Sequence, residues 1–154
     1  MEELKIYIDS AEEIRHIIKE IGAKYSKSLD VRDTYYNQPG MVLKITETDG
    51  KSFLTQLKAK NGGFEFVKKE ELQNADKKKK EFEQKFGVLC ILEKTREFWD
   101  YKDYNINLNL FNDIGNFLIV EGKSVNPDFF TTILGIENPR YLTKSFAQLK
   151  LDTI

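Results

Sequence analysis

Hydrophobic and polar residues alternate along most of the chain with the period of two that is typical of β-strands. In the opening segment the apolar side chains Leu4, Ile6 and Ile8 fall on one side of an extended chain, with polar neighbours between them. Seven further segments have strand character, and tight turns rich in Gly, Asn, Asp and Pro separate several of them. They are residues 28–37, 41–48, 51–60, 64–72 and 88–99, and the two halves of a hairpin over 106–123.

A helical period replaces this alternation in two places. Residues 10–22 carry isoleucines on one face, with Ser10 and Glu13 as a capping box and Gly22 after the last turn. Residues 74–87 predict a second helix, which begins at Asn74 or Asp76 and ends at Gly87. In the tail we expect a short helix over 126–130 and another across 140–151.

Eight short strands joined by tight turns, with few helices, indicate an α+β protein whose sheet is predominantly antiparallel, as a barrel or a curled sheet. With 154 residues and no visible linker, we expect a single domain over residues 1–154.

Charge and composition exclude several classes of function. The 24 basic and 25 acidic residues nearly balance, which predicts no general attraction to nucleic acid or to an anionic membrane. The single histidine, His16, and the single cysteine, Cys90, argue against a catalytic triad and a multi-histidine zinc site. The acidic start "MEELKIYIDS" lacks the pattern of a signal peptide, so we expect a cytoplasmic protein.

One face of the predicted sheet carries most of the chemistry. Strand alternation places the following cations and carboxylates on it: Glu3, Lys5, Lys44, Lys58, Lys68, Glu70, Lys94, Arg96 and Glu121. Periodicity alone favours a face in contact with water, which is common in antiparallel sheets. In the alternative, the sheet closes on itself with its apolar face outward under the helices, and the charged face lines a tunnel. Enclosed cations of this kind would bind a polyanion such as a phosphate chain.

Several segments, taken in order, resemble a known family. They are "EELKI", "IGAK", "RDTYYN", "VLKI", "TQLKAK", "VKKEEL", "LEKTREFW", "INLNLFNDIGNFLIVEG" and "TKSFAQL". In this pattern the sequence is similar to CYTH-domain proteins of the triphosphate tunnel metalloenzyme superfamily, nearest to the class IV adenylyl cyclase and thiamine triphosphatase-like branch. The resemblance implies a closed eight-stranded barrel with helices packed on the outside. It further implies that the charged face lines a tunnel for a triphosphate such as ATP or tripolyphosphate.

The resemblance also assigns roles to residues. It implies that the triphosphate is bound by Lys44, Lys58, Lys68, Lys94 and Arg96. It implies a divalent cation, Mg2+ or Mn2+, on Glu3 and Glu121 with Glu70 nearby, and a contact on the catalytic side from Lys5. A homodimer would suit the family.

The chain departs from the family pattern at five positions. Met1, Leu72 and Ile119 stand where the family has glutamate, Asn109 where it has aspartate, and Thr46 where it has arginine. Since Asn lacks charge and Ile offers no ligand atom, we expect a single metal at most.

The departures leave three functions open. The first is metal-dependent phosphotransfer, either cyclisation of ATP to cyclic AMP and pyrophosphate or hydrolysis of a triphosphate. The second is a non-catalytic module that binds a nucleotide or polyphosphate. The third, a purely structural ion network, is the weakest, because buried charges rarely repay their desolvation.

Overall fold

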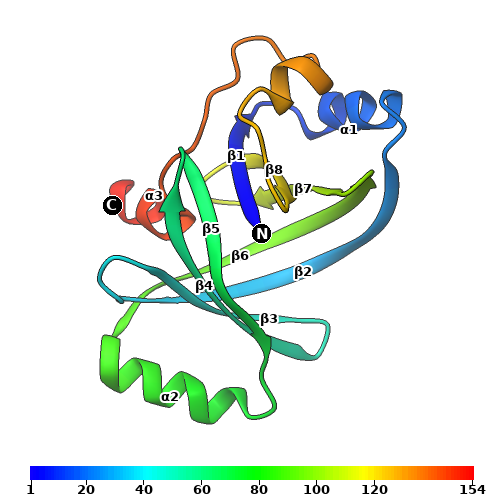
Figure 1. Ribbon diagram of the computed structural model, residues 1–154. Helices are drawn as coiled ribbons and strands as arrows, with labels where there is room; N and C mark the ends of the chain where they lie inside the picture. Colours follow the sequence, from blue (N-terminus) through cyan, green and yellow to red (C-terminus); the bar gives the residue numbers. More distant parts are fainter.

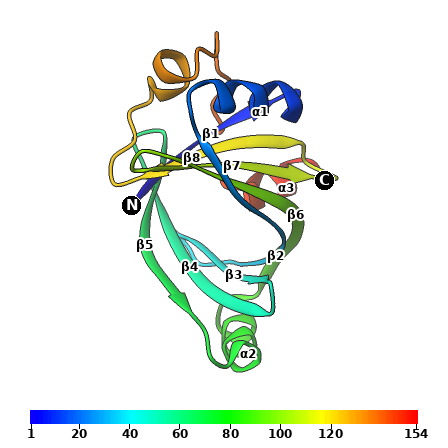
Figure 2. The same cartoon turned by 90° about the vertical axis from the view of Figure 1, so that its right-hand side faces the viewer.

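The computed structural model describes all residues from 1 to 154, and its eight strands form one closed antiparallel barrel. Around the barrel the strands follow the order β1-β5-β4-β3-β2-β6-β7-β8, as Figures 1 and 2 show from two sides. The strands are β1 (Glu2–Ile8), β2 (Lys24–Tyr36), β3 (Val42–Thr48), β4 (Lys51–Lys60), β5 (Gly63–Glu71), β6 (Val88–Tyr101), β7 (Tyr104–Phe111) and β8 (Asn116–Gly122). The closed barrel predicted from the resemblance is therefore confirmed.

Helix α1 (Ala11–Glu20) and helix α2 (Ala75–Phe86) begin and end where the sequence predicts. The Ser10 hydroxyl accepts a hydrogen bond from the backbone N–H of Glu13, and the Asn74 side chain accepts one from Lys77. These bonds satisfy N–H groups that have no partner within the first turn. Gly87 follows α2 with a positive φ of 79°, a conformation that glycine adopts without strain.

The apolar faces of the strands point outward, toward the helices. Under α1, the buried side chains of β1, β7 and β8 pack against Ile14 and Ile18, with Phe129 and Phe130 of the five-residue π-helix η1 (Phe129–Ile133) beside them. Under α2, a smaller cluster on β2, β3 and β4 packs against Phe82 and Phe86. The main hydrophobic layers therefore lie outside the barrel, which frees much of its interior for polar side chains.

The C-terminal helix is shorter than the sequence predicts. Helix α3 (Phe146–Asp152) begins only after Ser145, whose hydroxyl accepts a hydrogen bond from the N–H of Gln148. The preceding residues instead run along β1, where the N–H of Tyr7 donates to the carbonyl of Arg140 and the N–H of Leu142 donates to the carbonyl of Lys5. This pairing uses backbone groups that a helix over 140–145 would need, so the predicted start at residue 140 was wrong.

Three bulges change the face on which side chains lie. In the ladder between β4 and β5, Gln56 pairs with Lys68 and Leu57 with Phe66, which leaves Val67 without a partner. In the ladder between β2 and β6, the register shifts between Tyr25 and Lys27 and again between Tyr35 and Tyr36. A bulge adds one residue to one strand and so reverses the alternation beyond it. No helix in the structure is long and apolar enough to span a bilayer.

Candidate functional site

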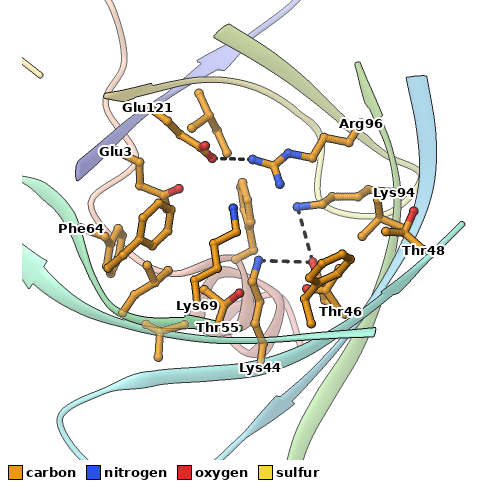
Figure 3. A pocket seen from close by; sticks show the side chains of 18 of the residues that line it. Glu3, Lys44, Thr46, Thr48, Thr55, Phe64, Lys69, Lys94, Arg96 and Glu121 are labelled. Carbon is orange, nitrogen blue, oxygen red and sulfur yellow. Dashed lines mark hydrogen bonds and ion pairs between the residues drawn. The ribbon is translucent and has the colours of Figure 1, made fainter. Parts of the chain in front are cut away.

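The barrel encloses a cavity of about 240 Å³ lined by charged side chains from six of its strands. Figure 3 shows most of the lining residues, which point toward one another across the barrel. The cations are Lys5, Lys27, Lys44, Lys69, Lys94 and Arg96, and the carboxylates are Glu3, Asp33 and Glu121. Cationic side chains therefore outnumber carboxylates two to one along the lining of the cavity.

Asp33 on β2 links two of these cations. Its carboxylate lies 3.6 Å from the Nζ atom of Lys44 and 3.4 Å from that of Lys94, and it accepts a hydrogen bond from Thr46. Burial alone would raise the pKa of Asp33, but the two lysines and the hydroxyl together lower it to about 2. Asp33 is therefore a fixed negative charge that spaces Lys44 and Lys94 apart.

Lys5 and Lys94 are the most enclosed cations of the cavity. Burial lowers the pKa of Lys94 to about 7, although Asp33 opposes the shift. Burial likewise lowers the pKa of Lys5 to about 8, with Glu3 acting in the opposite direction. The Lys5 Nζ atom lies 4.3 Å from the ring centres of both Phe64 and Phe146, so aromatic faces replace part of its lost hydration.

Arg96 on β6 is held from two sides. One guanidinium N–H donates to Glu121 on β8 at 2.5 Å, and its Nε donates to the Asn107 side chain at 3.0 Å. Asn109 donates to the same Asn107 oxygen at 2.7 Å. The pKa of Glu121 is lowered despite its burial, because Arg96 and Lys69 favour the charged form. This network fixes the direction of the guanidinium, which leaves it aimed into the cavity.

Glu3 and Glu121 stand directly opposite each other in the ladder between β1 and β8. Both are buried and line the cavity, and no ion pair reaches the Glu3 carboxylate in Figure 3. Side by side, two carboxylates repel each other unless a cation lies between them. The chain contains no group of three or more acidic, His or Cys side chains that could hold a metal by themselves. Mg²⁺ is typically bound by one or two carboxylates together with substrate phosphates and water, so this pair of oxygen donors fits such an ion.

The structure brings six of the nine sequence-predicted site residues into the cavity. They are Glu3, Lys5, Lys44, Lys94, Arg96 and Glu121. Each lies in a part of its strand where the alternation is regular, so its face could be predicted from the sequence.

The inward orientation predicted for Lys58, Lys68 and Glu70 is corrected by the structure. Lys58 lies on the outer face of β4 and pairs with Glu65 at 3.7 Å, since the inner face of that strand carries Thr55 and Leu57. Lys68 and Glu70 pair with each other at 3.4 Å on the outer face of β5, and both side chains are about half exposed. The bulge at Val67 reversed the alternation on which the prediction for β5 relied.

Three charged lining residues were missed by the sequence reasoning. Lys69 faces the cavity because of the same bulge. Lys27 shares the regular alternation of Val31 and Asp33, but it precedes residue 28, where the sequence analysis began this strand. Asp33 lies in the segment "RDTYYN", two residues from Val31 and from Tyr35, which also line the cavity. A strand period of two therefore places all three side chains on one face. The alternation that places Asp33 and Lys27 inward was present in the sequence, whereas the bulge that turns Lys69 inward leaves no clear mark there.

Comparisons with solved structures support the same architecture. The PH1012 protein from Pyrococcus horikoshii superposes with a TM-score of 0.85 at 24% identity, over 97% of this chain and 99% of that one. A protein from Vibrio parahaemolyticus described as a candidate adenylate cyclase gives a TM-score of 0.76 at 14% identity, over 97% and 96%. HpAC1 from Hippeastrum, described as a candidate adenylyl cyclase with a dominant triphosphatase activity, gives 0.68 at 15% identity, over 99% and 96%. At these identities the likeness shows the fold.

A search of the curated proteins finds no match to the chain. The sequence matches the CYTH domain family over residues 2–145, a range that includes every strand of the barrel and every charged residue of the cavity. The chain therefore belongs to the CYTH domain family.

Proposed function

We propose that this protein binds a triphosphate in the barrel cavity and catalyses phosphotransfer at it with the help of Mg²⁺ or Mn²⁺. The proposal covers two reactions that need the same site: hydrolysis of the triphosphate, and cyclisation of ATP with release of pyrophosphate. Membership of the CYTH family supports the proposal, as do the descriptions of the Vibrio and Hippeastrum proteins.

The observation that carries the proposal is the uncompensated positive charge inside the barrel. The cavity holds six cationic and three carboxylate side chains, and Lys5 and Lys94 lie almost entirely out of contact with water. Burying unpaired charge costs several kcal/mol, so a ligand that supplies negative charge would stabilise such an arrangement. A chain of phosphates supplies several negative charges in a row and matches the spread of cations over five strands.

In this proposal the lining residues have complementary tasks. Lys44 and Lys94, spaced by Asp33, and Arg96, fixed by Asn107, would bind phosphate oxygens from different sides of the barrel. Preorganised cations of this kind stabilise charge that develops on the leaving phosphate, without moving during the reaction. Lys69 on β5 would add a further cation opposite Arg96, and Lys5 would contact the same phosphates from β1.

Glu3 and Glu121 would hold the divalent cation, which supplies charge neutralisation on the phosphates and favours the deprotonated nucleophile. Glu3 faces the cavity without an ion-pair partner, and Glu121 can accept from Arg96 through one oxygen while it presents the other. Their positions on neighbouring strands keep both carboxylates at the same level of the barrel.

A phosphorus NMR time course tests this proposal. The purified protein is incubated with ATP and, separately, with tripolyphosphate, in the presence of Mg²⁺ or Mn²⁺ and again with a chelator. We expect metal-dependent turnover, in which orthophosphate identifies hydrolysis and pyrophosphate with cyclic AMP identifies cyclisation. Glu121→Gln should lower the rate by about a hundredfold or more, because the loss of even an outer-shell partner of a metal ligand costs roughly 10- to 100-fold.

Glu70→Gln is the matched control, because Glu70 is a carboxylate of the same barrel that faces outward. It should leave the rate within about twofold of the wild type, as expected for an exposed ion pair. Equal losses in both variants, or turnover that persists with chelator, would argue against a metal site on Glu121.

A second candidate function is binding of a triphosphate without turnover. Asn109 and Ile119 contribute no charge to the interior, and Glu121 is already paired with Arg96. This candidate predicts that, relative to ATP alone under each condition, the protein broadens or shifts the phosphorus signals of intact ATP equally with Mg²⁺ and with chelator, while no product forms. The same time course therefore separates the two functions.

A further inference from the structure

One end of the barrel is closed by aromatic and aliphatic side chains. Buried residues of four strands meet there with residues of the C-terminal segment: Tyr35, Leu92, Phe111, Phe117, Ile119, Leu142, Phe146 and Ala147. Among the phenylalanines of this cluster, only Phe146 also lines the cavity, while Phe111 and Phe117 pack behind it at ring-centre distances of 4.9 and 5.0 Å. We call the Phe146 ring the floor of the cavity. In Figure 3, α3 lies behind the lining side chains.

Exposure of the cations increases away from this floor. Lys5 and Lys94 lie 4.3 and 5.1 Å from the Phe146 ring centre, and only 3% and 6% of their surfaces are exposed. Lys27 and Lys69, which also line the cavity, are exposed residues. The cavity therefore opens at the end marked by Lys27 and Lys69 and is blind at Phe146.

The floor is anchored by the chain around it. Leu142 donates its backbone N–H to the carbonyl of Lys5, and Lys150 of α3 pairs with Asp113 of the β7–β8 turn. The chain on both sides of Phe146 is therefore anchored to the barrel, and one anchor is on the strand that carries Lys5.

We propose that Phe146 is a specificity-determining residue, which restricts the site to phosphate chains with a free terminal phosphate. This inference rests on the proposed function. A chain can enter only from the open end, so its leading phosphate reaches Lys5 and Lys94 and stops against the Phe146 ring. An ester group on that phosphate would have to occupy the space of the ring. The ligand class is therefore a linear phosphate chain with at least one unesterified end.

Calorimetric titration with three nucleotides tests the inference. The probes are ATP, ADP and ATP methylated on its terminal phosphate, each with Mg²⁺ at low temperature and again with a chelator. ADP has the same formal charge as the methyl ester, so the comparison separates a blocked end from a lost charge. For the wild type we expect the ester to bind at least about tenfold more weakly than ADP, since a well-packed site rejects one extra methyl group by roughly this factor.

In Phe146→Ala the affinities for the ester and for ADP should differ by no more than about threefold, because this variant lacks the ring that the methyl group would meet. Phe111→Ala is the control, since it removes a phenyl ring from the same cluster but not from the cavity lining. Phe111→Ala should keep the wild-type ratio of ADP affinity to ester affinity. Thermal melts check that both variants are folded. Equal affinities of the wild type for the ester and for ADP would overturn this inference but not the proposed function. Failure of ATP to bind under either condition would overturn the proposed function as well.

Discussion

A lysine inside a protein keeps its charge only when other groups replace the water it has lost. For Lys94 that replacement is incomplete: Asp33 lies 3.4 Å away and the ring of Phe146 lies beside it, yet burial still lowers its pKa to about 7. The charges that face it come from neighbouring elements, namely Asp33 on β2, Lys44 on β3, Glu3 on β1 and Arg96 on β6 itself. An anion that binds beside Lys94 should therefore raise its pKa, so that Lys94 takes up a proton on binding.

This residue gives a pH-dependent prediction. Below about pH 7 Lys94 is already charged in the free protein, so its full positive charge should attract the triphosphate without any proton uptake. As the pH rises through 7, the free protein loses this proton, so affinity should fall and binding at about pH 8 should take up a proton. Calorimetry in two buffers of different ionisation enthalpy measures that uptake.

Lys94→Met keeps an unbranched side chain, one atom shorter than that of lysine, and removes the titrating group. The variant should take up fewer protons than the wild type at about pH 8, and the difference belongs to Lys94 because Lys5 and the phosphates titrate in both proteins. Equal uptake in the two proteins would show that Lys94 does not meet the ligand.

At the scale of single elements, the bulge in β5 decides which lysines reach the cavity. Val67 has no partner on β4, so Lys69 points inward while its neighbours Lys68 and Glu70 pair with each other outside. Regular strands such as β1 and β3 obeyed the period of two, and their inward residues could be predicted from the sequence. The orientation of the β5 residues beyond Val67 could not be predicted, because a bulge depends on the pairing between two strands and not on the local sequence pattern of one.

Adjacent lysines on opposite faces provide a matched pair of variants. Lys69→Met should weaken tripolyphosphate binding by about fivefold, a modest loss because the side chain is partly solvated. Lys68→Met should change the affinity by less than about twofold, since its charge is directed away from the cavity. The affinities are measured by calorimetric titration, and a larger loss for Lys68→Met would reverse the assignment of faces.

At the scale of the whole molecule, the sheet of the barrel separates the hydrophobic core from the charged cavity. Its main hydrophobic layers lie outside the sheet, under α1 and α2, and its charges lie within the sheet. The eight strands and the first two helices could be predicted from periodicity and capping residues such as Ser10 and Asn74. Closure could not be predicted from periodicity alone, because alternation looks the same whether the polar face meets water or a cavity. The resemblance to CYTH proteins supplied that step.

The central claim is that the interior cations, and not those outside, bind a triphosphate. The most direct test is an NMR titration of the protein with tripolyphosphate, in which the side-chain CεH₂ signals of lysine are followed. We predict that the signals of Lys44, Lys69 and Lys94 shift together with one affinity, while those of Lys58 and Lys68 stay in place. Shifts confined to Lys58, Lys68 and other outer lysines, with the interior signals unchanged, would contradict the claim.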